Sequence, residues 1–294
     1  MDAVAKRHPE IAFELVTMRT QGDRFSAAHP TSVLPDNQSG KAGKADKADK
    51  EIVKGLFVKE LEAALKDGRI DFAVHSLKDM SVLANEELPI VALSPREVPY
   101  DVAVFRAGTH AGGVTELSAF AGLTGGCSSA RRRVQFERAI GCRVKPIRGN
   151  IVTRMEKLDH GDDYDFLILA AAGLLRLGMA NRIGFCFPGN VILPAAGQGV
   201  LACQGRAGEN YGYLEDFHDR DVEACVTAER AFAAATGGGC SSPVAAFAKI
   251  AGGELFLEGL FVDEERGVFE RGEVAGGRDE ALRLGEALAR RLLA

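Results

Sequence analysis

The sequence predicts two α/β domains followed by a small α+β domain. From about residue 54 to residue 190, apolar strand-like runs alternate with amphipathic helix-like runs, as in sheets covered by helices. The segment "VILPAAGQGVLACQGR" (191–206) is punctuated by proline and glycine, which favours a chain crossing between domains. Beyond Asp221 a long helix, a hairpin and a closing helix follow. We therefore expect domain 1 at 1–98 and 197–219, domain 2 at 99–196 and domain 3 at 220–294, with crossings near 95–101 and 193–199.

The first domain opens with a strand-like segment and a long polar stretch. Residues 10–18, "EIAFELVTM", alternate apolar and polar residues as a half-buried strand does. Residues 22–50 are polar and include the near-repeat "KAGKADKADK". A structureless stretch of that length in a compact domain is either a lid or a disordered segment.

A helix and a strand follow in the first domain. In "KGLFVKELEAALKDG" (54–68) the apolar residues share one helical face, and Gly68 supplies the stop. "RIDFAV" (69–74) is expected to be a buried strand, with "HSLKDM" (75–80) at its carboxyl end. Ligands of open α/β sheets bind outside the carboxyl ends of strands, so this hexapeptide is a candidate site.

The second domain repeats the alternation. "CSSARRRVQFERAI" (127–140) predicts a helix capped by Ser128 or Ser129, with arginines in its first turn. Cations there oppose the helix dipole, whereas a bound anion is stabilised by both the free N–H groups and the guanidinium groups. A strand, a turn at Gly149–Asn150 and a second helix follow, and "YDFLILA" (164–170) is a buried strand.

Composition sets the broad class of the protein. The chain has 294 residues and a formal net charge of −5. No apolar run approaches the roughly 20 residues that span a bilayer, and "MDAVAKRHPE" lacks the features of a secretory signal. None of the six cysteines forms a C-x-x-C pair, so no metal site is expected. We expect a cytoplasmic protein with no membrane partner.

Positive charge is concentrated in one region of this acidic chain. Residues 127–157 hold nine basic residues against two acidic ones. The excess indicates an anionic ligand, although a solvated face or a nucleic-acid patch has the same signature. Phe136 alone offers an aromatic ring near the arginines, and the overall acidity also counts against nucleic acid.

A cysteine stands among glycines in "TGGGCSSPVAAF" (236–247). Glycines suit a backbone that something bulky approaches closely. Cys240 is therefore either an incidental thiol in a loop or the attachment point of a group.

Seven motifs, in order and approximate spacing, resemble the porphobilinogen deaminase family from about Ile11 onward: "KGLFVKELE", "DFAVHSLKD", "CSSARRR", "IRGNIVTR", "LPAAGQG", "TAERAF" and "GGGCSSPVAAFA". The resemblance implies two lobes of the periplasmic-binding-protein type plus a small third domain. It implies a transferase of tetrapyrrole biosynthesis that joins four porphobilinogen molecules head to tail into hydroxymethylbilane, with release of ammonia. It also implies a covalent dipyrromethane cofactor, tethered here to Cys240, and a monomer without nucleic-acid partners.

The resemblance assigns roles to individual residues. Asp79 is expected to carry the chemistry, because a carboxylate can protonate a departing amine, stabilise a cationic pyrrole and later accept the ring proton. The alternative is that Asp79 caps the next helix. The acetate and propionate groups of the pyrroles call for cations and hydrogen-bond donors, and the residues assigned to them are Lys54, Lys78, Ser128, Ser129, Arg131, Arg132, Arg148, Arg154 and Arg176. Lysines on an exposed helix face are usually solvated, which is the alternative for Lys54.

The chain also departs from the family's pattern. It begins near what is normally the helix after an opening strand, so the first strand of domain 1 is expected to be missing. Cys127 stands where the family has Thr, and Arg133 stands where it has Gln. The rival hypothesis is therefore an N-terminally truncated, non-catalytic anion-binding protein of the same fold.

Overall fold

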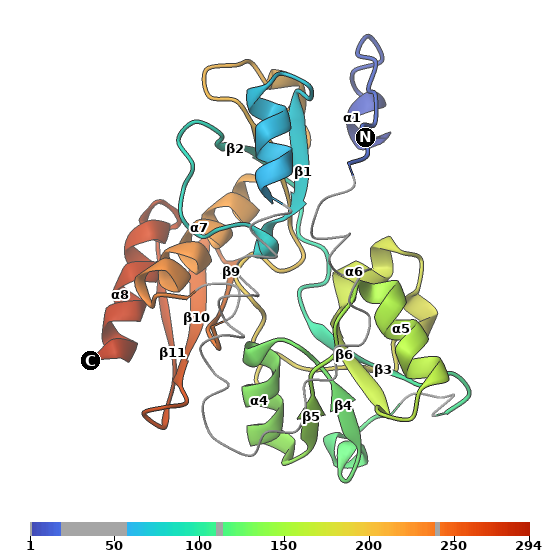
Figure 1. The fold of residues 1–294 in the computed structure, drawn as a ribbon. Coiled ribbons are helices and arrows are strands. Elements are labelled where there is room, and N and C mark those ends of the chain that lie inside the picture. The colour runs from blue at the N-terminus through green and yellow to red at the C-terminus, as the bar shows by residue number, and fades with distance from the viewer. Residues whose placement is uncertain (1, 19–57, 110–113, 239–241) are drawn as a thin grey trace.

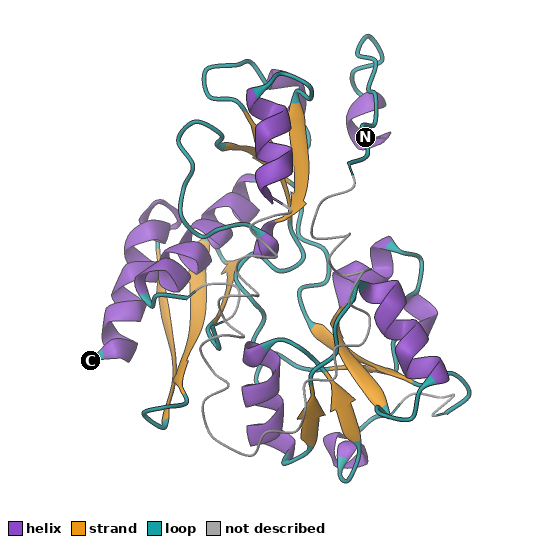
Figure 2. Ribbon diagram, in the orientation of Figure 1, coloured by secondary structure: helices purple, strands orange, loops and turns teal. Residues whose placement is uncertain are grey.

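The computed structural model describes residues 2–18, 58–109, 114–238 and 242–294. Its strands form one five-stranded and two three-stranded sheets, and Figures 1 and 2 show the sheets in three separate lobes. The α/β class with a C-terminal α+β region is confirmed. Each sheet falls within one predicted domain, while the exact boundaries and the missing opening strand stay predictions.

The first sheet has the order β1–β8–β2, with β8 antiparallel to both neighbours. A helix at 58–66 packs on one face, where Leu65 contacts Ala73 and Leu88. Leu77, Val200 and Ala202 belong to the cluster that joins the sheet to helix α7. The short helix η1 follows β1 directly. The bounds are β1 Phe72–Ser76, η1 Leu77–Asp79, β2 Ile90–Leu93, β8 Leu201–Gly205 and α7 Arg220–Ala235.

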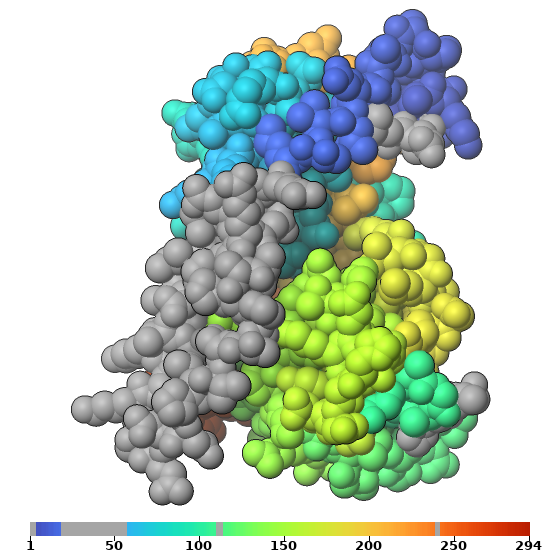
Figure 3. All heavy atoms as spheres, turned by 45° about the vertical axis from the view of Figure 1, so that its right-hand side comes forward, coloured from blue at the N-terminus to red at the C-terminus, as the bar shows by residue number. Residues whose placement is uncertain are grey.

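The predicted strand at 10–18 is wrong. Residues 11–18 pair with no described strand; Phe13 packs against Phe72 and Tyr213, while Leu15 is 72% exposed. Alternation without a neighbouring sheet edge leaves the backbone groups without a ladder partner. In Figure 3 this N-terminal segment (blue) lies against the cyan elements of the first lobe. The preceding helix α1 spans Asp2–Ala5.

The predicted helix at 54–68 is present over 58–66 among the described residues. Gly68 adopts a left-handed φ of 68°, in keeping with its expected role as a stop. The following strand begins at Phe72 rather than at 69, because the N–H groups of Arg69 and Ile70 still bond to the Ala64 carbonyl of the helix.

The second sheet is covered by helices on both faces. Its order is β5–β4–β6–β3–β7; α4 packs on one face through Phe136, and α5 packs on the other through Met155 and Leu158. The bounds are β3 Asp101–Phe105, η2 Leu117–Phe120, β4 Thr124–Gly126, α4 Ala130–Ile140, β5 Arg143–Lys145, α5 Ile151–His160, β6 Phe166–Ala170, α6 Ala171–Arg176, η3 Ala180–Arg182 and β7 Phe185–Cys186.

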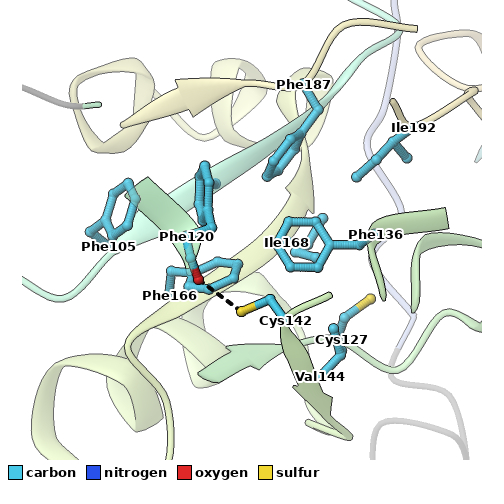
Figure 4. Close-up of a cluster of buried hydrophobic side chains, with 11 residues drawn as sticks. Phe105, Phe120, Cys127, Phe136, Cys142, Val144, Phe166, Ile168, Phe187 and Ile192 are labelled. Atoms are coloured by element: carbon cyan, nitrogen blue, oxygen red, sulfur yellow. Dashed lines mark hydrogen bonds between the residues drawn. The ribbon is translucent and has the colours of Figure 1, made fainter. Parts of the chain in front are cut away.

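An aromatic core fixes α4 on its sheet (Figure 4). The fully buried Phe120 ring lies 4.9 Å from the Phe166 ring and 5.7 Å from the Phe136 ring of α4. The Cys142 thiol donates to the Phe120 carbonyl at 2.9 Å. Close packing of this kind resists movement. It therefore holds α4, and with it the backbone of the arginines in the first turn of α4, in a fixed position on the sheet.

The third sheet, β11–β10–β9, is antiparallel throughout and carries α7 and α8 on one face. Its hairpin also contacts the second domain: Arg133 of α4 makes two bonds to Glu264, at 2.6 and 2.8 Å, and the Arg138 guanidinium lies 4.3 Å from the centre of the Phe269 ring. The bounds are η4 Gly212–Leu214, β9 Ala245–Ala251, β10 Glu254–Asp263, β11 Val268–Gly276, η5 Arg278–Glu280 and α8 Ala281–Leu293.

Candidate active site

The centre of the candidate site is a carboxylate that the sequence analysis did not single out. Asp101, the first residue of β3, is 0% exposed. Arg132 bonds it through Nε at 2.9 Å and through a terminal nitrogen at 2.7 Å, and Arg131 bonds it at 2.7 Å. Burial raises the pKa of Asp101, but the charges of Arg131, Arg132 and Lys78 outweigh burial and lower the pKa from 3.8 to about 2.

Lys78 and Asp79 reach this cluster from the first domain, at the end of β1. Lys78 is half-buried, and its Nζ donates to the Gln198 side-chain oxygen at 3.5 Å. Burial, reinforced by the charge of Arg132, lowers the pKa of Lys78 from 10.5 to about 8, so the amine is charged below that pH and neutral above it. Asp79 is exposed, and its charge acts on both Lys78 and Arg154.

Two glycines of "LPAAGQG" allow the crossing segment to lie against this site. Gly197 and Gly199 have φ values of 71° and 90°. A Cβ on Gly197 would lie 2.7 Å from the Leu77 side chain, and one on Gly199 would lie 2.4 Å from the Glu97 carbonyl oxygen. Only glycine adopts this backbone without strain, and the result places Gln198 between Lys78 and Asp101.

Helix α7, which belongs to the third predicted domain, is hydrogen-bonded to the crossing segment through Glu229. Glu229 is 0% exposed and accepts from Arg96 at 2.7 Å, from the Gly197 N–H at 2.7 Å and from the Ala248 N–H at 2.8 Å. Burial raises the pKa of Glu229, and the charge of Arg96 opposes that shift. One carboxylate thus joins the third predicted domain to two separate segments of the first, at Arg96 and Gly197.

The predicted serines have structural partners. Ser128 donates to the Ile147 carbonyl and accepts from the Ile147 N–H at 3.1 Å, which connects the loop before α4 to the segment that follows β5. Ser129 caps α4 by accepting from the Arg132 N–H at 3.5 Å. The capping role that the sequence offered to either serine belongs to Ser129, and ligand binding by the pair stays a prediction.

The other predicted arginines differ in their surroundings. Arg154 donates from Nε to the Gly149 carbonyl at 2.7 Å, and burial together with the Arg132 charge lowers its pKa. Arg176 is exposed and bonds the Gly199 carbonyl at 2.7 Å. Arg148 is exposed, and its place in the site stays a prediction.

Two predicted residues, Cys240 and Lys54, lie outside the described residues. Strand β9, which follows the cysteine loop, lies near the arginines, however. The Ala246 N–H of β9 bonds the Pro194 carbonyl at 3.2 Å, and Arg131 bonds the neighbouring Leu193 carbonyl at 2.5 Å.

Sequence reasoning missed four residues of the site: Arg96, Asp101, Gln198 and Glu229. A signal existed for two of them. Asp101 opens the otherwise apolar run "DVAVF", and Glu229 shares a helical face with Val222, Cys225 and Phe232, all of them buried. A charged residue within a buried pattern requires a partner.

Within the described residues, no helix combines the length and the apolarity that crossing a membrane requires.

Comparison with known proteins identifies the family. Residues 1–211 match the model "Porphobilinogen deaminase, dipyromethane cofactor binding domain", and residues 223–294 match "Porphobilinogen deaminase, C-terminal domain". The porphobilinogen deaminase of Ruminiclostridium josui is 41% identical over 293 residues, which cover 99% of this chain and 91% of that protein. That of Chromobacterium violaceum is 40% identical over 289 residues, covering 97% and 86%.

Among solved structures, the L-cystine solute receptor of Neisseria gonorrhoeae aligns with a TM-score of 0.31 and 15% identity, over 62% of this chain and 76% of the receptor. That likeness is too weak to support an argument. The two family models, by contrast, cover nearly the whole chain and agree with the full-length relatives. The chain therefore belongs to the porphobilinogen deaminase family.

Proposed function

We propose that this chain is an active transferase that condenses four porphobilinogen molecules into hydroxymethylbilane with release of ammonia. The observation that carries the proposal is the meeting of Lys78 and Asp79 from the first domain with Arg131 and Arg132 from the second. They meet at the crossing segments, near strand β9, which follows the loop that bears Cys240 in the chain.

The cations suit the substrate's carboxylates. Three positive side chains, Lys78, Arg131 and Arg132, surround the single negative charge of Asp101, and Arg154 lies within electrostatic reach. The cluster therefore keeps a positive excess, and guanidinium groups bind carboxylates with charge-assisted hydrogen bonds. This donor set fits dipyrromethane, which carries acetate and propionate groups and, when bound to Cys240, supplies the pyrrole on which the product grows.

The Asp79 side chain is accessible to a substrate. Its carboxylate is exposed at the end of η1, next to a partly desolvated ammonium group. In that position a carboxylate oxygen can hold a proton near a leaving amine, stabilise a neighbouring cation and take up a ring proton. In the same proposal, the Lys78 ammonium group holds a substrate carboxylate. We further propose a cytoplasmic monomer whose partner is this small-molecule substrate.

Incubation with porphobilinogen tests the proposal. We expect one linear tetrapyrrole for every four molecules of ammonia, measured by absorbance after cyclisation and by an enzymatic ammonia assay. Saturable binding of porphobilinogen without ammonia release would contradict the proposal and favour the non-catalytic anion-binding protein.

A further inference from the structure

We infer that Asp101 is a positioning residue, which holds the guanidinium groups of Arg131 and Arg132 in the orientation that the ligand's carboxylates require and, through Gln198, links them to Lys78. This inference deepens the proposed function and rests on it for its meaning in catalysis. The hydrogen bonds of Asp101 and Gln198 on which it is based are independent of the proposed function.

Asp101 forms hydrogen bonds with the guanidinium groups of both arginines. Arg132 contacts the Asp101 carboxylate through Nε and one terminal guanidinium nitrogen. Its other terminal nitrogen donates to the Ile168 carbonyl at 3.1 Å. Arg131 is anchored at 2.5 Å to the Leu193 carbonyl and at 2.7 Å to Asp101. Both arginine side chains are at least nine-tenths buried. Two like charges this close need a shared counter-charge, and Asp101 supplies it.

Gln198 extends the arrangement to the other domain. Its side-chain nitrogen donates to Asp101 at 2.9 Å and to the Pro99 carbonyl at 2.5 Å. Its oxygen accepts from both Lys78 and Arg131 at 3.5 Å. A continuous set of hydrogen bonds therefore runs from Arg132 through Asp101 and Gln198 to the lysine beside Asp79.

An electrostatic role and a positioning role of Asp101 predict opposite changes in substrate affinity for Asp101→Asn. The substitution raises the net charge of the cluster by one, so charge alone predicts tighter binding of an anionic substrate. If Asp101 acts by positioning, the freed guanidinium groups repel each other and turn away, and binding weakens in spite of the added charge. The sign of the change in KM separates the two roles.

Residue-resolved labelling with phenylglyoxal tests the positioning without requiring turnover. The matched control is Asp159→Asn, which removes a carboxylate bonded to Arg182 at 2.8 and 3.0 Å in the same predicted domain. We expect Asp101→Asn to raise the labelling rate of Arg131 and Arg132 about tenfold, since labelling follows local opening. Asp159→Asn should raise it at Arg182 alone. Unchanged labelling of Arg131 and Arg132 in folded Asp101→Asn would overturn the inference.

Steady-state kinetics supply the second readout. KM for porphobilinogen is expected to rise about tenfold in Asp101→Asn and to stay unchanged in Asp159→Asn, with the change in kcat smaller than the change in KM. An equal or lower KM in Asp101→Asn would overturn the inference even if the enzyme is active. An inactive wild-type chain would contradict the proposed function instead, and the labelling result would still decide the positioning.

A second variant covers the case in which Asp101→Asn does not fold. Gln198→Met keeps the volume and the net charge but removes the donor to Asp101 and the acceptor for Lys78. We expect a rise of about threefold in KM and in Arg131 labelling. Wild-type values for both would overturn the inference.

Discussion

Replacing Asp79 with Asn is expected to lower kcat for porphobilinogen about a thousandfold while changing KM less than about threefold. The amide matches the carboxylate in size but can neither hold the transferred proton nor stabilise a cation. Loss of general acid–base catalysis alone costs 10²–10⁴-fold. Because the side chain is exposed, folding should be unaffected. Initial rates of ammonia release measure both constants.

Asp71→Asn is the matched control for this change. Asp71 is an exposed carboxylate next to the opposite end of β1, 3.5 Å from Arg206. Its loss should leave kcat unchanged. A kcat within tenfold of wild type for Asp79→Asn would remove Asp79 from the chemistry and leave it as a local structural residue.

Replacing Glu229 with Leu is expected to lower the free energy of unfolding by about 3–5 kcal/mol. Removing one partner of a buried ion pair strands the other charge, here the Arg96 guanidinium. The change also leaves the Gly197 and Ala248 N–H groups without their acceptor. Because the carboxylate joins the crossing segment to α7 and β9, we expect the midpoint of urea denaturation to fall and the third domain to loosen first.

Glu223→Leu supplies the control on the same helix. Glu223 is exposed and faces His218 at 3.2 Å, and a pair of this kind contributes at most about 1 kcal/mol. If Glu229→Leu and Glu223→Leu denature at the same urea concentration, the bonds of Glu229 do not hold the domains together.

The parts of the fold that local signals encode could be predicted from the sequence. The expected serine cap of α4 is Ser129, and the turn expected at Gly149–Asn150 precedes α5, where Asn150 is the N-cap. The C-terminal hairpin was recognisable from its two strand-like runs and the turn between them. Strand β9 was not predicted, because the sequence has no separate turn signal between the glycine loop and this strand. The strand expected at 10–18 failed because alternation says nothing about whether a sheet edge is available.

In the cluster around Asp101, the sequence predicted the cations but not their counter-charge. The arginines stand out as a run, and their motif gives their family role. Their counter-charge, Asp101, lies 30 residues away from Arg131 in sequence, and Gln198 lies 67 residues away. Glu229 and Arg96 are separated by 133 residues. Such pairings depend on how the domains cross, which composition and periodicity do not specify.

The proposed function requires that this chain carries its own primer on Cys240 and extends it. Intact-mass measurement of the protein, produced with porphobilinogen available, tests that claim most directly. We expect the wild-type chain to be heavier than its sequence by one dipyrromethane, and Cys240→Ser to have the unmodified mass. A wild-type chain of unmodified mass, or an adduct that persists in Cys240→Ser, would contradict it.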